Sequence, residues 1–158
     1  MTDIRPKDLS AVTAPTVGDK IMLDGTTARS ITVENLAGSG ALKSNAQGIG
    51  YSTGAGGTVT QATSKATGVT LSKATGQITM NAAALAAGTI VSFVLTNTLI
   101  AATDVLVLNH ISGGTPGSYS LNARCAAGSA TIDVRNNTGG SLGEAIVIQF
   151  ALVKGVNA

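Results

Sequence analysis

The residues that most often carry enzyme chemistry are scarce in this chain of 158 residues. His110 is the only histidine, so a general base, if there is one of this type, must be His110. A catalytic histidine needs an orienting carboxylate within hydrogen-bond reach, and the spacing gives no reason to pair it with Asp104 or Asp133. We therefore expect His110 to be a hydrogen-bonded or solvated residue at the end of a strand. The sequence predicts no catalytic residue.

Metal and thiol chemistry are equally limited. Cys125 is the only cysteine, which excludes a disulfide within the chain and a zinc site built on cysteines. A single histidine cannot make a multi-histidine site, and eight acidic residues scattered along the chain leave few carboxylate pairs. The neighbouring Arg124 could activate the Cys125 thiol, but a buried structural cysteine is the preferred interpretation. We predict no metal and no cofactor.

A glycine-rich stretch over residues 48–57 has the composition of a phosphate-binding loop. Such a loop needs a following Lys-Ser/Thr pair or a helix, whereas Thr58-Val-Thr-Gln continues as a strand. The ten basic residues include no adjacent pair, and the formal net charge is only +2. Nucleotide and nucleic-acid binding are therefore not expected.

The segment 90–108 is 19 residues long and largely apolar, which is close to the length of a membrane span. Thr96, Asn97, Thr98, Thr103 and Asp104 interrupt it, so two strands joined by a polar turn explain it better. The first nine residues mix charges and contain no apolar stretch, so we expect neither a signal peptide nor a membrane partner.

Charge divides the chain into two parts. Residues 1–45 hold ten of the eighteen charged side chains, whereas 25 of the 39 Leu, Ile, Val and Phe residues follow position 75. We expect an N-terminal arm over residues 1–47, with β-prone pieces at 20–24 and 29–33 around the turn dipeptide Asp24-Gly25, and a helical turn at 33–36. The glycine-rich stretch would be a linker or loop, and residues 48–158 would form one β domain.

Regular turn signals divide the second part into short strands, predicted at 58–61, 69–71, 77–80, 90–96, 105–110, 119–124, 130–135 and 146–153. The fold class predicted is all-β, an antiparallel β-sandwich or jelly roll of about eight strands with a short N-terminal arm. The aliphatic runs at 90–95 and 105–108 are typical of strands buried on both sides. The short stretch 81–87 would be a connector rather than a helix, and the similar octets 65–72 and 73–80 would be consecutive strands.

Residues 50–80, beginning Gly-Tyr-Ser-Thr-Gly-Ala-Gly-Gly, are similar to the β domain of small virion proteins of tailed bacteriophages. The continuation over 81–97 and 100–105 and the ending Ser141-Leu-Gly-Glu-Ala-Ile-Val-Ile-Gln-Phe-Ala-Leu-Val-Lys-Gly155 resemble the same phage head-fibre, decoration and tail-fibre proteins. Residues 19–25 and 29–36 resemble, less closely, the short modules that attach phage appendages to a particle.

The resemblance implies a non-enzymatic structural protein that is a homo-oligomer, commonly a trimer. We expect a capsid decoration or head-fibre protein on the particle surface, made in the bacterial host cytoplasm. Its arm would attach to the major capsid protein or another virion protein. A tail fibre or tail adaptor remains an alternative. A carbohydrate-binding module is another, with Tyr51 and Tyr119 as the available aromatic platforms.

Overall fold

The computed structural model describes residues 42–45 and 48–156. The chain divides into two units, residues 1–32 and 33–158, and every described residue belongs to the second. The strands predicted at 20–24 and 29–33 and the helical turn at 33–36 lie outside the described residues.

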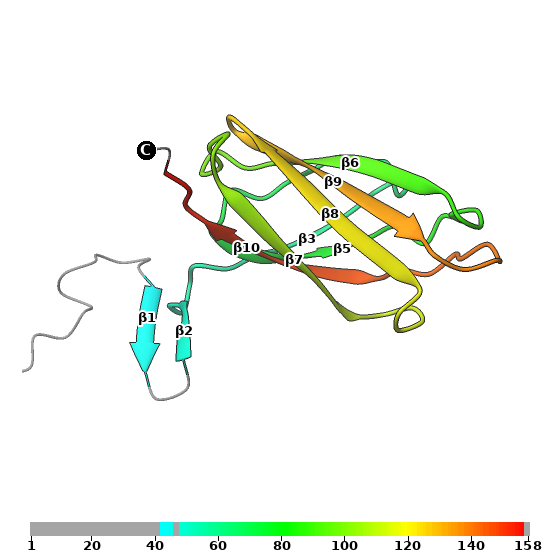
Figure 1. Ribbon diagram of the computed structural model, residues 1–158, viewed down its shortest axis with the longest axis horizontal. Helices are drawn as coiled ribbons and strands as arrows, with labels where there is room; N and C mark the ends of the chain where they lie inside the picture. The colour runs from blue at the N-terminus through cyan, green and yellow to red at the C-terminus, as the bar shows by residue number, and fades with distance from the viewer. Residues whose placement is uncertain (1–41, 46–47, 157–158) are drawn as a thin grey trace, which may run out of the picture. The chain divides into compact units, whose positions relative to one another are not determined.

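The described chain forms two four-stranded sheets, packed face to face as a β-sandwich (Figure 1). Sheet I has the strand order β3-β5-β10-β7, and sheet II has the order β4-β6-β9-β8. All eight predicted strands are present, and the all-β sandwich is confirmed. Their bounds are β3 Thr58–Thr60, β4 Val69–Thr70, β5 Thr75–Thr79, β6 Ile90–Thr96, β7 Val105–Ser112, β8 Tyr119–Ala126, β9 Ser129–Asn136 and β10 Val147–Val153.

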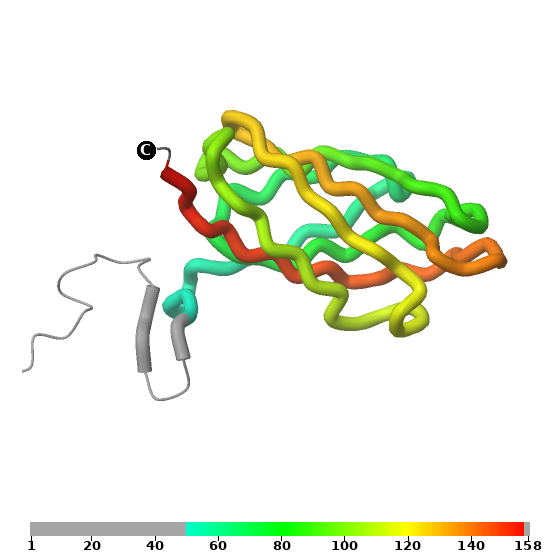
Figure 2. Tube along the Cα trace, in the orientation of Figure 1, coloured from blue at the N-terminus to red at the C-terminus, as the bar shows by residue number. Residues whose placement is uncertain are grey.

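Successive strands alternate between the two sheets, and only the β8–β9 hairpin stays within one sheet (Figure 2). The expectation of purely antiparallel sheets was therefore wrong in two places, since β3 pairs with β5 and β4 pairs with β6 in parallel. A parallel pair needs a crossover between its strands. Here the intervening strand, which lies in the opposite sheet, provides that crossover.

A separate two-stranded antiparallel sheet joins β1 (Leu42–Asn45) to β2 (Gly48–Tyr51). The first part of the glycine-rich stretch is thus a strand, and its interpretation as linker or loop was wrong there. Glycine weakens a strand by its conformational freedom, but its backbone still makes the ladder hydrogen bonds.

The core lies between the sheets and follows the two-residue period of the strands. Ile148 and Phe150 of β10 are fully buried, as are Ile132 and Val134 of β9 on the opposing sheet. Alternate residues of the aliphatic runs point outward instead. Ile90, Val94, Val105 and Val107 are 44–59% exposed, so the expectation of strands buried on both sides was wrong.

Buried carboxamides hold the connecting loops. Asn136 donates to the carbonyls of Leu85 (3.0 Å), Ala86 (3.2 Å) and Gly140 (2.7 Å). Leu85 also forms an isolated bridge with Leu142. Residues 81–87 contain no helix and connect β5 to β6, as predicted. Every buried side-chain nitrogen and oxygen atom of the described residues has a hydrogen-bond partner.

Candidate functional site

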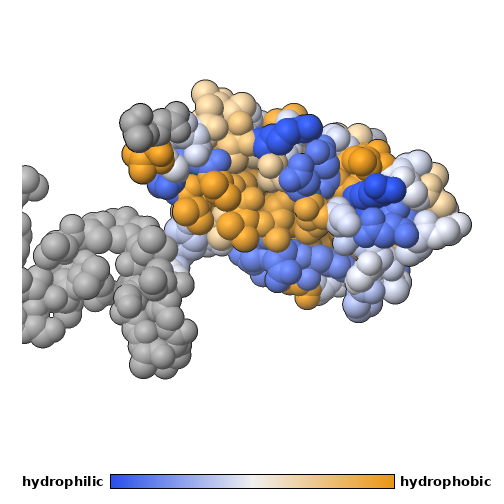
Figure 3. All heavy atoms as spheres, viewed as in Figure 1, coloured by the Kyte–Doolittle hydropathy of each residue, from blue (hydrophilic) through white to orange (hydrophobic). Residues whose placement is uncertain are grey.

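The outer face of sheet I is the most unusual surface of the sandwich. None of the residues in β3, β5, β10 and β7 is Asp, Glu, Lys or Arg. Figure 3 shows hydrophobic residues gathered over the region of β7. The exposed apolar side chains of this sheet are Val105, Val107, Ile111 and Val153.

Strand register orders the outer face of sheet I into rows. Val105 lies opposite Val153, and Val107 lies opposite Ala151. The next row is polar, and runs across three strands as Asn109, Gln149 and Gln77. The face therefore combines an apolar end with a line of carboxamides, without a formal charge.

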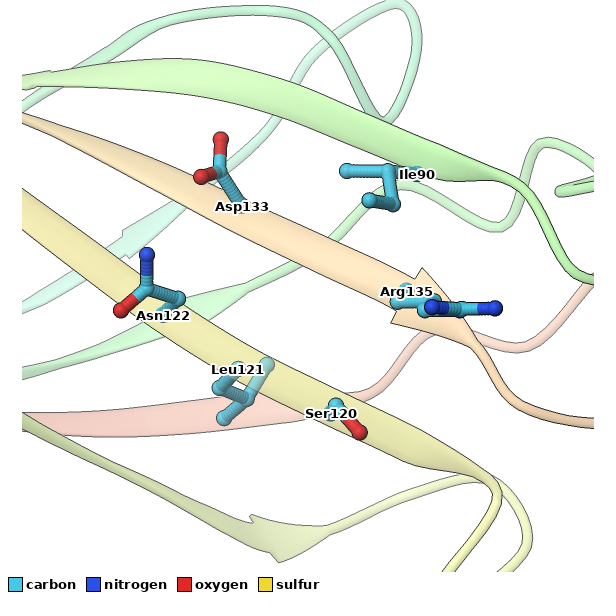
Figure 4. Close-up of a pocket in the computed structure, with 6 residues that line it drawn as sticks. All are labelled: Ile90, Ser120, Leu121, Asn122, Asp133 and Arg135. Carbon is cyan, nitrogen blue, oxygen red and sulfur yellow. The ribbon is translucent and has the colours of Figure 1, made fainter.

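The outer face of sheet II differs in charge and shape. It carries Arg124, Asp133 and Arg135, and Asp133 Oδ1 accepts hydrogen bonds from Ser92 Oγ (2.6 Å) and Arg124 (3.3 Å). Beside this group lies a hollow of about 210 Å³ (Figure 4). It is lined by Ile90, Ser120, Leu121, Asn122, Asp133 and Arg135.

The hollow combines hydrogen-bonding side chains with one exposed aliphatic side chain, that of Ile90. Neither Asn122 nor Arg135 makes a side-chain hydrogen bond to another residue within 50–156, so both can bind a ligand. Amide and guanidinium groups bind hydroxyl and carboxylate oxygens, and the exposed Ile90 offers contact to C–H groups. Such a hollow suits a small hydroxylated molecule.

The structure does not pair His110 with either aspartate. His110 Nε2 lies 3.1 Å from the Ser112 carbonyl oxygen and 2.6 Å from that of Gly113, so this nitrogen donates its hydrogen. Its ring packs edge-on against Tyr119, with centroids 5.8 Å apart. These contacts fit a structural histidine at the end of a strand.

Sequence reasoning missed a network around Glu144. Tyr119 Oη donates to Glu144 Oε2 (2.8 Å), and Thr115 Oγ1 donates to Oε1 (2.7 Å). These two hydroxyls lower the pKa of Glu144, whereas burial, followed by the neighbouring carboxylate, raises that of Tyr119. No local motif indicates this group, because Glu144 lies 25 and 29 positions from Tyr119 and Thr115.

The two tyrosines do not form open platforms. Tyr119 belongs to the core, and the half-buried Tyr51 donates its hydroxyl hydrogen to the Leu152 carbonyl. The expectation that both are available as aromatic platforms was therefore wrong for Tyr119. Because the Tyr119 ring is buried, it is not available for stacking, and a sugar site in the hollow would depend on Ile90 for its apolar contact.

The other sequence candidates have structural roles. Asp104 accepts a hydrogen bond from Lys154 Nζ at 2.5 Å and a second from the Ala101 amide at 2.8 Å. Cys125 is half-buried, and burial raises the pKa of its thiol, which is the opposite of activation. Lys65, which no sequence motif indicated, is also buried, and its ammonium donates to the carbonyls of Asn81 and Glu144.

No G-x-S-x-G nucleophile elbow is expected in this chain, yet residues 50–54, Gly-Tyr-Ser-Thr-Gly, do match the letters of that motif. That motif requires a strand, a sharp turn and a helix. Here Ser52 follows β2, and the next element is β3. The two acceptors of His110 are the backbone carbonyls of Ser112 and Gly113, so the match has no catalytic partner in His110.

Within residues 42–45 and 48–156, no group of three or more His, Cys, Asp or Glu residues could hold a metal ion. The same part of the chain contains no helix long and apolar enough to cross a membrane. The segment 90–108 forms β6, a turn and the first residues of β7, as predicted. Comparisons with family models, curated proteins and solved structures find no match to this chain.

Proposed function

We propose that this chain is a non-enzymatic structural protein of a tailed-bacteriophage virion, a capsid decoration or head-fibre protein on the particle surface. The resemblance of residues 50–80 and 141–155 to phage head-fibre and decoration proteins supports it. The sandwich supports it as well, because extensive β pairing with short connections suits a protein that has to persist on a particle.

The observation that carries the proposal is the uncharged outer face of sheet I. Monomeric soluble proteins rarely expose large apolar patches, and larger ones usually mark interaction sites. Here three exposed valines, Val105, Val107 and Val153, adjoin one another on a face without a charge. A homo-oligomer, and a trimer by resemblance, would cover such a face.

Attachment to the particle is assigned to the N-terminal arm, residues 1–47. That segment holds most of the charged residues of the chain. The major capsid protein, or another virion protein, is its proposed partner.

Particles made without this chain provide the test. The full chain, added back, should bind at fixed sites on the head, visible by cryo-electron microscopy, whereas a chain lacking residues 1–40 should not bind. Density on the tail would instead support a tail fibre or adaptor. Absence of the chain from purified particles would overturn both assignments, and normal decoration by the truncated chain would overturn the role of the arm.

The hollow on sheet II supports a second candidate function, recognition of a carbohydrate. Its amide, carboxylate and guanidinium groups match sugar hydroxyls and carboxylates, and the exposed Ile90 matches the C–H face of a sugar ring. A glycan array tests it. Binding should be lost in Asn122→Ala and Arg135→Ala and kept in Thr131→Ala, a control on the same face outside the hollow. An array without a hit would remove this candidate.

A further inference from the structure

We propose that copies of this chain associate through the outer face of sheet I, and that the carboxamide row Asn109–Gln149–Gln77 fixes how they align. The inference rests on the homo-oligomer of the proposed function and names its surface. It does not depend on where in a virion the protein is used.

The charge distribution selects this face rather than its opposite. Sheet I contains no charged residue, whereas sheet II presents Arg124, Asp133 and Arg135. Burying a charge without a partner is costly, whereas burying valine is favourable. The outer face of sheet I can therefore be covered without placing a charge in a dry interface.

The same face favours a second copy as its occupant. A partner that binds by charge complementarity would meet no charged residue on this face. A carboxamide, in contrast, carries both hydrogen-bond donors and an acceptor, so identical amides on two copies can pair with each other. A neutral face with a line of amides is thus complementary to itself.

The row has free hydrogen-bonding capacity. Gln149 Nε2 donates to Thr75 Oγ1 at 2.9 Å, which holds that amide against the sheet. The side chains of Asn109 and Gln77 make no hydrogen bond to other residues in the part of the chain described. Both project from the exposed side of their strands.

The position of the row explains why it would set alignment. On one side of it lie Val107 and Ala151, and on the other lies Val147. A copy displaced by one row would place amides against valines, where their hydrogen-bonding groups would be buried without partners. A single polar residue in an apolar interface has this effect in coiled coils, where it specifies register.

Strand β7 gives the face an accessible border. It is the last strand of sheet I, and it contains no Lys, Arg, Asp or Glu and no proline, which are residues that protect edge strands. Its outward residues Val105, Val107 and Ile111 are 41–56% exposed. This unprotected edge therefore adjoins the apolar end of the face.

The full chain at about 10 µM, studied by size exclusion with light scattering, tests the surface. The wild type should have a multiple of 15.6 kDa, about 31 kDa if two copies pair face to face across a two-fold axis and about 47 kDa if three meet around a three-fold axis. Val107→Lys should associate at least tenfold more weakly. Val94→Lys is the matched control. Val94 is exposed to a similar extent (44%, against 51% for Val107), but Val94 lies on the outer face of sheet II.

Gln77→Lys keeps the test decisive should Val107→Lys fail to fold. Gln77 is an exposed polar residue, so lysine there leaves the monomer folded by circular dichroism and should dissociate the assembly. A wild-type mass of 15.6 kDa would overturn the proposal. So would an equal loss of association in Val94→Lys, or unchanged association in both Val107→Lys and Gln77→Lys. A monomeric wild type whose Val107→Lys variant no longer joins particles would show that another virion protein occupies the face.

The carboxamide row has its own readout. Asn109→Leu combined with Gln77→Leu should keep or strengthen association, yet native mass spectrometry should show several oligomers where the wild type shows one. A single unchanged oligomer would overturn the role of the row. Failure of the protein to decorate particles would contradict the virion assignment only, because these measurements use the isolated protein.

Discussion

Phe150 of β10 lies directly opposite Gly76 of β5, and its ring fills the space that a side chain at position 76 would need. A Cβ atom on Gly76 would lie 2.9 Å from Phe150 Cε1, 2.8 Å from the Gly57 carbonyl oxygen and 2.7 Å from Leu71 Cδ2. This small residue allows the largest buried side chain of sheet I to reach the core.

Gly76→Ala should therefore destabilise the sandwich by about 1–3 kcal/mol, as overpacked cores do. Urea unfolding measures the change. Gly139→Ala is the control, since a Cβ there meets nothing within 4 Å, and its effect should stay within about 0.5 kcal/mol.

Phe150→Leu tests the cause. It should cost stability alone, yet in combination with Gly76→Ala it should cost less than the sum of the two single changes, because the smaller side chain yields room. Additive effects would show that Gly76 is required for a reason other than the ring of Phe150.

Adjacent residues of β10 should separate folding from assembly. Ile148 is fully buried, so Ile148→Asp places an unpaired charge in the core and should unfold the protein, with a loss above about 4 kcal/mol. Val147 points to the outer face, so Val147→Asp should leave the circular dichroism spectrum intact and lower the mass found by light scattering. Unfolding by both variants, or an assembly unchanged by Val147→Asp, would contradict this assignment.

The strands were predictable because their side chains alternate and their turns carry glycine. Ile90–Thr96 was predicted at its observed bounds, and the other seven strands differ by at most two residues at each end. The parallel pairings were not predictable, since they depend on which sheet each strand joins. Alternation also shows which residues share a face, but not that Val105 and Val107 lie on an outer one.

The candidate surfaces depend on contacts between distant positions. The hollow joins Ile90 to residues 120–122 and to Asp133 and Arg135 through the pairing of β6, β9 and β8. Glu144 similarly receives hydrogen bonds from residues 25 and 29 positions away. The composition of the strands is enough to indicate that one sheet lacks charge. The hollow and the hydrogen bonds to Glu144, in contrast, follow only from the way the strands pair and pack.

Asp104 should make the protein sensitive to acid. Its side chain is only 1% exposed, and hydrogen bonds from Lys154 and from the Ala101 amide hold its pKa below the usual value. A depressed pKa stabilises the folded state above the unfolded-state pKa of about 3.9, and that contribution is lost as the pH falls through the folded-state value. The free energy of unfolding should therefore decrease as the pH falls below about 5.

Urea unfolding at pH 7 and pH 3 measures this effect. Asp104→Asn should be less stable at pH 7 and should lose less stability on acidification, with Glu144 contributing the remainder. Lys154→Met should act in the same direction, and Lys73→Met, an exposed control, should behave as the wild type. An unchanged acid dependence in Asp104→Asn would show that its carboxylate is not the group responsible.

The chain's two tyrosines, Tyr51 and Tyr119, should make it sensitive to alkali. Burial raises the pKa of both hydroxyls, and the carboxylate of Glu144 raises that of Tyr119 further. The folded state thus keeps these protons at a pH where the unfolded state, with a pKa of about 10, has released them. Stability should be complete below about pH 10 and should decline as the pH rises above it.

Absorbance at 295 nm follows the tyrosinate directly. At pH 11 the native protein should show much less tyrosinate than the protein in urea, and the signal should appear together with loss of the β-sheet circular dichroism. Tyr51→Phe leaves Tyr119 alone, whose titration should lie higher than that of the wild-type pair, since only Tyr119 also faces a carboxylate. Native titration of both hydroxyls near pH 10, with the sheets intact, would show that the two rings are solvated.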